Sequence, residues 1–183
     1  VTCIPLNVQA KKLLGEIVAA SCLQNLKLVL GSKETTFDAA ELELDLSHSS
    51  MWSDDLYILT GWLSHNPQVN PKRTTPTVKR LALSHNQNLV SHTQLGVPEA
   101  PWKPFCAVLG AADIVTVELD ATRLEHPKAV EPLAEAMQTM PEVTVLSVKG
   151  NRIRSDVLTT LESSSRGGPL HRVAFFELHC GDL

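Results

Sequence analysis

Short runs in which every second residue is apolar alternate along this chain with longer stretches in which apolar residues recur every three or four positions. The clearest run is 143–153, VTVLSVKGNRI, where Leu146 and Val148 are separated by one residue and Asn151 follows. A period of two predicts a short strand with one apolar face, whereas a period near 3.6 predicts an amphipathic helix.

The same spacing, written LxxLxLxxNxL, recurs in order along the chain. It fits segments 41–51, 78–89, 114–124, 143–153 and 170–178. Three departures are visible: Glu41 fills an apolar position, Leu89 comes one place late, and Leu178 stands where the polar residue is expected. Self-similarity at a regular interval predicts a repeat architecture.

Helical spacing follows three of these runs, in 54–64, 130–140 and 155–164. A strand followed by a helix, several times over, predicts parallel strands on one face and helices on the other. The central apolar positions of the five runs are 37, 36, 29 and 27 residues apart; they are Leu44, Leu81, Val117, Leu146 and Val173. The two longer intervals predict Pro-rich insertions, which we place at 67–77 and 90–104, the second one before a short helix that begins with Pro104.

The first forty residues are less regular, and we treat 1–40 and 41–183 as separate regions. Residues 9–21 have the pattern of a helix, 26–30 (LKLVL) that of a strand, and 31–40 (GSKETTFDAA) that of a loop. Region 1–40 is either a degenerate repeat or a cap, and the pattern leaves both open. Terminal repeats must cover an otherwise exposed core, but the pattern leaves open whether the last segment, 171–183, is such a cap.

These five runs resemble the leucine-rich repeat family, and repeats of 27 to 29 residues resemble its ribonuclease-inhibitor type. The resemblance covers about residues 40–178. It implies an α/β solenoid of about five repeats, with a curved parallel sheet on the concave face and helices on the convex face.

Residues 42–69, LELDLSHSSMWSDDLYILTGWLSHNPQV, and 78–89, VKRLALSHNQNL, show a closer resemblance. Together they look like the leucine-rich region of CARMIL proteins, which link actin capping protein to myosin and membranes. Tropomodulins and Ran GTPase activators carry similar repeats. The resemblance implies a regulator of the actin cytoskeleton, while the Pro-containing loop 67–77 departs from the family pattern.

Composition favours an intracellular, cytoplasmic protein cut from a longer chain. The net charge of −4 and pI near 6.0 argue against a nucleic-acid partner. No apolar run is long enough to span a bilayer, so we expect no direct membrane insertion. The four cysteines are scattered and are expected to be free and mostly buried; they are Cys3, Cys22, Cys106 and Cys180.

The sequence LSH, which occurs three times, raises the alternative of a Ser/His hydrolase. Neighbours on a strand point to opposite faces, so Ser84 and His85 are poorly placed as nucleophile and base. His48 and His85 hold the same repeat position, and we expect them roughly 5 Å apart on adjacent strands. Asp120 is the only candidate for a third metal ligand, so we predict no metal, no cofactor and no enzymatic activity.

Function is therefore expected on the outward side of the sheet, as a scaffold surface that binds a protein partner. The residues predicted to contact that partner are Glu43, Asp45, Arg80, Glu118, Asp120, Lys149 and Arg172. Asn86 and Asn151 are predicted to form a structural asparagine ladder, whose side-chain amides hydrogen-bond backbone groups of adjacent turns.

Overall fold

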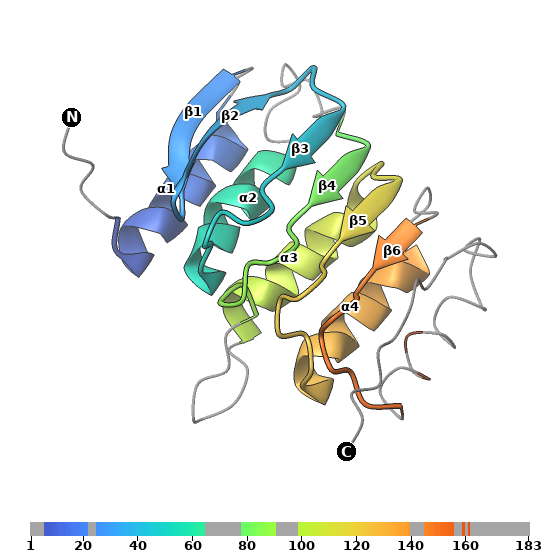
Figure 1. Cartoon of the computed structure of the whole chain (residues 1–183). Helices are drawn as coiled ribbons and strands as arrows, with labels where there is room; N and C mark the ends of the chain where they lie inside the picture. Colours follow the sequence, from blue (N-terminus) through green and yellow to red (C-terminus); the bar gives the residue numbers. More distant parts are fainter. Residues whose placement is uncertain are drawn as a thin grey trace.

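The computed structural model of the chain describes residues 6–21, 25–64, 78–90, 99–139 and 145–155, together with residues 159 and 161. This part of the chain forms a mixed α/β structure with four α-helices and a parallel sheet (Figure 1). A separate two-stranded hairpin lies beside the first strand of the sheet.

The parallel sheet has four strands of three residues each, in the order of the chain. They are β3 (Glu43–Asp45), β4 (Arg80–Ala82), β5 (Thr116–Glu118) and β6 (Val145–Ser147). Their register aligns Leu44, Leu81, Val117 and Leu146. The alignment of these four positions made from the sequence is therefore confirmed residue for residue.

One face of the sheet is covered by a layer of helices that lie side by side (Figure 1). The helices are α1 (Val8–Ala20), α2 (Leu56–Leu63), α3 (Glu99–Ala111) and α4 (Pro127–Thr139), and a 3₁₀ turn, η1 (Ser53–Asp55), precedes α2. The opposite face, which we call the open face, carries no helix in the described part of the chain.

The core lies between the sheet and the helices. The aligned strand residues are all buried, as are Trp62 of α2 and Trp102 of α3, whose Nε1–H donates to the carbonyl of Ala129 at 2.7 Å. Trp52, in contrast, is 56% exposed. Two of the three tryptophans are therefore core residues and one is available at the surface.

After each strand the chain turns through a left-handed backbone conformation at the same repeat position. His48, His85, Ala121 and Gly150 all have φ between 51° and 66°. Each of the first two turns bonds to the turn that follows it in the array. His48 N–H donates to the carbonyl of Ser84 at 3.0 Å, and His85 N–H donates to that of Asp120 at 2.6 Å. These bonds extend the parallel pairing beyond the three-residue strands.

Buried polar side chains follow these turns. The amide of Asn86 donates to the carbonyls of Leu46 and Leu83, both at 2.8 Å, and accepts from Met51 N–H at 3.0 Å. Asn151 accepts from the N–H groups of Thr122 and Leu124 at 2.8 and 3.0 Å. Each amide thus satisfies backbone groups of the preceding turn, as the sequence predicted.

Residues 31–40 are not the loop that the sequence predicted. β1 (Asn25–Leu30) and β2 (Lys33–Asp38) form an antiparallel hairpin closed by Gly31 and Ser32. Gly31 has φ +58°, and a Cβ there would lie 2.1 Å from the carbonyl oxygen of Ser49, so both conformation and space require glycine. The polar segment KETTFD becomes a strand because the apolar strand before it supplies a partner.

The second predicted insertion, 90–104, is also corrected in part, because α3 begins at Glu99 and includes Pro101 and Pro104. Pro101 lies in the first turn, where a proline costs no hydrogen bond because those N–H groups have no partner within the helix. Pro104 lies inside the helix, where a proline removes one backbone hydrogen bond, so the packing of α3 must offset this loss. The insertion at 67–77 and the last segment, 171–183, lie outside the described residues.

Helices α1 and α2 approach each other through two glycines. A Cβ at Gly15 would lie 2.2 Å from the carbonyl oxygen of Tyr57, and a Cβ at Gly61 would lie 2.1 Å from that of Gly15. Backbone therefore meets backbone at this crossing, and α1 is held close to the rest of the helix layer.

We predict that Asn86→Ala lowers the free energy of unfolding by about 1–3 kcal/mol, because it leaves buried backbone groups of two turns without partners. Chemical denaturation measures this loss. Gln87→Ala is the matched control, since Gln87 is the exposed neighbour and should change stability by less than about 0.5 kcal/mol. Equal effects of the two substitutions would contradict the role of the amide.

We also predict that Gly15→Ala destabilises the chain by about 1–3 kcal/mol, because the helices must move apart. Gly110→Ala provides the comparison. Its Cβ would meet the hydroxyl of Thr139 at 2.5 Å, and this exposed side chain can rotate away. Thermal unfolding should show a clearly larger decrease in melting temperature for Gly15→Ala than for Gly110→Ala.

Candidate functional site

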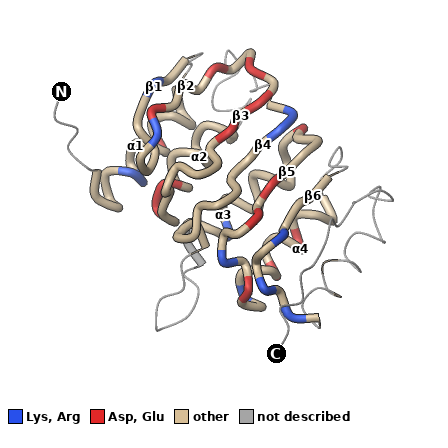
Figure 2. Tube along the Cα trace, in the orientation of Figure 1, with Lys and Arg blue, Asp and Glu red and all other residues tan. Residues whose placement is uncertain are grey.

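Four of the seven residues predicted to bind a partner lie on the strands of the open face, namely Glu43, Asp45, Arg80 and Glu118. Asp120 and Lys149 lie two residues after the ends of β5 and β6. Arg172 lies outside the described residues. Figure 2 shows acidic segments in β3 and β5 on either side of a basic segment in β4.

Arg80 connects three strands. Its Nε and Nη2 donate to the two carboxylate oxygens of Glu118 at 2.9 and 3.1 Å, and Nη1 donates to Glu43 at 3.3 Å. The hydrogen bonds to Glu118 raise the pKa of the guanidinium further above its ordinary value. The forked pairing fixes the planes of both groups, so the row Glu43, Arg80, Glu118 presents an ordered pattern of charge.

Ala82 is fully buried although it lies on the same side of β4 as Arg80, which faces outward. It stands between Asp45 and Glu118 in the sheet register. A residue without a long side chain at this position leaves space for the guanidinium and carboxylate groups to lie across the sheet. The charged row therefore lies over a position that is closed to solvent at Ala82.

Asp45 accepts a hydrogen bond from the backbone N–H of Ser47 at 2.9 Å. This bond is the main cause that lowers the pKa of the Asp45 carboxyl, with smaller contributions from Lys33 and Arg80, while partial burial opposes the shift. The carboxylate is exposed on the open face and is ionised at neutral pH.

Asp120 is engaged by its neighbours. Its Oδ1 accepts from the hydroxyl of Ser147 at 2.6 Å and from Lys149 N–H at 2.8 Å, and its own N–H donates to Ser84 Oγ at 3.1 Å. Asp120 thus links the turns after β4, β5 and β6. It contributes to the shape of this edge as well as to its charge.

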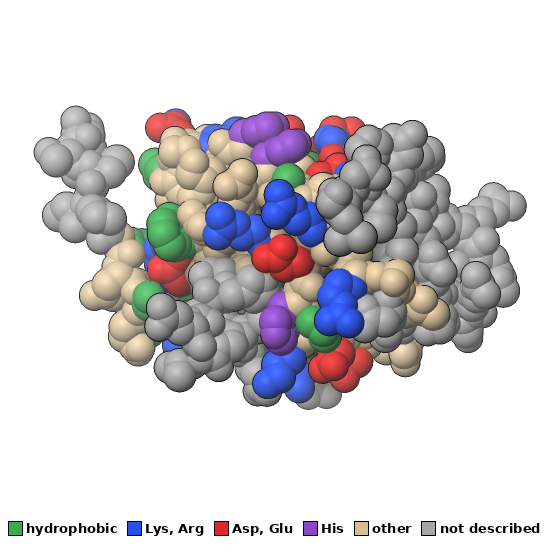
Figure 3. Space-filling view, turned by 60° about the horizontal axis from the view of Figure 1, so that its bottom comes forward, with side chains coloured by type: hydrophobic (Ala, Val, Ile, Leu, Met, Phe, Trp, Pro, Cys, Tyr) green, Lys and Arg blue, Asp and Glu red, His purple; other side chains and the backbone are tan. Residues whose placement is uncertain are grey.

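The histidine in the turn after β3 and the histidine in the turn after β4 stack on each other. The ring centroids of His48 and His85 are 4.1 Å apart and the rings are nearly parallel, which agrees with the adjacency expected from the repeat. Figure 3 shows two histidine side chains next to each other at the edge of the face that it draws. Ser84 is buried and hydrogen-bonded to Asp120, whereas His85 is exposed. Ser84 and His85 therefore do not form a nucleophile and base pair.

No group of three or more potential metal ligands occurs among the residues that the structure describes. Next to the stacked rings, the small residues Ala121 and Gly150 leave a polar hollow of about 410 Å³. Arg123 and Arg152 line it from equivalent positions of neighbouring turns, together with Glu125. Opposite charges within this hollow reduce its selectivity for an anion.

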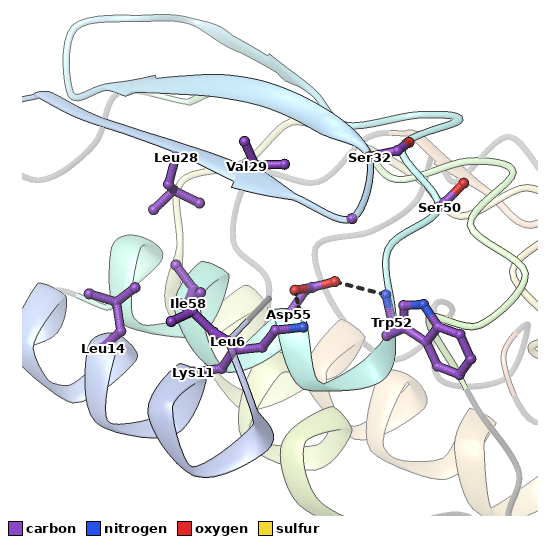
Figure 4. A pocket seen from close by; sticks show the side chains of 11 residues that line it. Leu6, Lys11, Leu14, Leu28, Val29, Ser32, Ser50, Trp52, Asp55 and Ile58 are labelled. Carbon is purple, nitrogen blue, oxygen red and sulfur yellow. Dashed lines mark hydrogen bonds and ion pairs between the residues drawn. The ribbon is translucent and has the colours of Figure 1, made fainter. Parts of the chain in front are cut away.

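A larger groove, of about 800 Å³, lies between the hairpin, α1 and the turn before α2 (Figure 4). Apolar side chains from the hairpin, α1 and the chain before it, the turn before α2, and α2 itself line most of the groove; they are Leu6, Leu14, Leu28, Val29, Trp52 and Ile58. The hydrophobic pattern did not predict this groove. The available signal is that apolar residues extend around the helix predicted in 9–21 beyond a single face.

Lys11 and Asp55 form the charged floor of this groove (Figure 4). Lys11 Nζ lies 2.6 Å from Asp55 and 3.1 Å from Asp54, and Asp55 also accepts from Trp52 N–H at 2.9 Å. Burial opposes the charge on Lys11, but the two carboxylates outweigh it and the pKa of the ammonium is raised. The pair fixes α1 to the start of α2.

Cys106 of α3 is buried and free, as expected, and burial raises the pKa of its thiol far above the ordinary value. Such a thiol is protonated and unreactive at neutral pH. The other three cysteines lie outside the described residues.

Comparison of the chain with protein-family models finds no match, and comparison with curated proteins finds none either. None of the helices in the described part of the chain combines the length and the apolar character needed to cross a membrane.

We predict that Asp45→Asn removes a pH-dependent contribution to stability. A lowered pKa in the folded state stabilises the protein above the unfolded pKa, near 3.8, and this contribution disappears as the pH falls through the folded value. The difference in unfolding free energy between wild type and variant should be below about 1 kcal/mol at pH 7. It should begin to fall near pH 3.8 and vanish only below the lowered pKa of the folded state. A difference that grows towards low pH would contradict this assignment.

Proposed function

We propose that the chain is a leucine-rich repeat type solenoid segment that acts as a protein interaction module, without enzymatic activity, and binds a protein partner on its open face. The observation that carries the proposal is the ordered row of Glu43, Arg80 and Glu118 on a sheet face over which no helix lies in the described part of the chain.

The solenoid assignment is supported by the parallel strands in chain order and by the repeated turn that follows them. Buried polar residues occupy the same position of each turn, one after the other; they are Ser49, Asn86, Thr122 and Asn151. A stack of such units presents one continuous strand face to solvent, and its outward side chains are available to a partner.

Charge pairing within the open face supports a protein ligand over a small molecule. Arg80 is held by Glu118, so its position is fixed before any partner binds, and the entropy cost of ordering it on binding is reduced. Asp45 and Glu43 remain exposed beside it. Complementary charges on a partner would then determine specificity and association rate.

A narrower proposal is a cytoplasmic regulator of the actin cytoskeleton similar to CARMIL proteins or tropomodulins. Its support is the resemblance of residues 42–69 and 78–89 to the CARMIL leucine-rich region. Actin-associated proteins among the captured partners would favour it, and their absence would leave the general interaction module without this specialisation.

The test is affinity capture with three forms of the chain, followed by quantitative mass spectrometry. We expect the double variant Glu43→Lys and Asp45→Lys to lose at least ten-fold of a specific partner. The control, Glu131→Lys with Glu135→Lys, makes the same change in net charge on exposed positions of α4 and should retain the partner. Equal recovery by all three forms would overturn the assignment of binding to the open face.

A further inference from the structure

The outer side of α1 carries an apolar stripe that no described residue covers. Leu13 and Ile17 are 54% and 53% exposed, and four-residue spacing places them on one side of the helix. At 100° per residue, this side lies opposite Gly15, whose backbone contacts α2. The stripe therefore faces away from the helix layer, in the direction in which another helix would continue it.

Lys12 and Glu16 flank this stripe. Both are exposed, and helical geometry places them together on one border, between the stripe and Gly15. Leu14, which lines the groove, lies on the other border, towards the hairpin. The outer side of α1 thus has an apolar centre with one acidic and one basic residue along a single border.

Strand β1 is the outermost described strand at this end of the molecule. It pairs only with β2 in the part of the chain that the structure describes, and β2 lies between it and β3 (Figure 1). The pair Leu30 and Lys33 closes a two-residue turn, so alternate residues of β1 bond to β2 and the backbone groups of Lys27 and Val29 point outward. These groups can pair with a further strand.

We propose that this end of the molecule, formed by Leu6, Leu13, Ile17, Val29 and the outer edge of β1, is the interface of a two-fold symmetric dimer of this chain. The surface is distinct from the open face, so the proposal goes beyond the proposed function. Exposed apolar residues gathered beside an unpaired strand edge are the features that such interfaces cover.

Self-complementarity favours a second copy as the occupant. A two-fold axis makes two identical strand edges antiparallel, and the same rotation makes the two α1 helices antiparallel. With the axis midway between Leu13 and Ile17, Lys12 of one copy and Glu16 of the other differ by two residues along the helix, about 3 Å. The dimer would then contain two opposite-charge pairs, each between Lys12 of one copy and Glu16 of the other.

The one ammonium group on the strand edge is compatible with this arrangement. Lys27 forms an ion pair with Glu34 of β2 within the same copy, so its charge is balanced before the edges meet. Leu6 and Val29 are 45% and 44% exposed at the groove. A second copy placed against α1 and β1 would cover the mouth of the groove and bury these side chains.

Sedimentation velocity of the 183-residue chain over a wide range of concentration tests the proposal. We expect a reversible monomer–dimer equilibrium, and Ile17→Glu should weaken it at least ten-fold. Leu42→Glu is the control, because Leu42 is 58% exposed beside β3 and lies outside this end surface. Circular dichroism verifies that both variants remain folded.

A charge exchange provides the second test. Lys12→Glu and Glu16→Lys should each weaken the dimer, and the double variant should restore it, because the pairs reform with opposite sign. In the dimer, amide hydrogen exchange at Lys27 and Val29 should also slow. A chain that stays monomeric throughout, or a dimer unaffected by both Ile17→Glu and the single charge reversals, would overturn the proposal.

Discussion

Satisfying the buried backbone groups at the turn after each strand is the constraint on which the rest of this structure depends. The strands of the parallel sheet have only three residues each, so most of the backbone near the core lies in turns that a sheet alone does not pair. An asparagine amide supplies donors and an acceptor from one side chain, and Asn86 and Asn151 use them on the turn before their own. Neighbouring units are thereby fixed at one spacing.

That spacing determines what the surface can present. Because the strands are in register, residues distant in the sequence become lateral neighbours, and Arg80 reaches Glu118 across 38 positions of the chain. The same register brings His48 onto His85. The open face therefore has a defined arrangement of charge although each strand contributes only two outward residues.

The hairpin lies at the end of the strand layer and α1 at the end of the helix layer, and both are held there by contacts other than those of the two asparagine amides. Gly15 and Gly61 allow α1 to approach α2 closely, and the ion pair of Lys11 with Asp55 fixes its position. The hairpin does not share the hydrogen-bonded sheet, and the apolar groove lies between it and α1. This end consequently exposes more apolar surface than the open face does, which is why it is the stronger candidate for association between copies.

The strand register could be predicted from the sequence, because Leu44, Leu81, Val117 and Leu146 must all enter one core and a shift by one residue would expose them. The buried asparagines could be predicted from it as well, since a polar residue at a fixed place after each apolar pair has few other uses. Only the tertiary structure decided that KETTFD is a strand, because its residues have little apolar alternation and depend on β1 for pairing. The start of α3 was likewise decided by burial of Trp102, which outweighs the signal of two prolines. Ion pairs and the groove depend on which distant side chains meet, and local patterns of hydrophobicity contain no information about those distances.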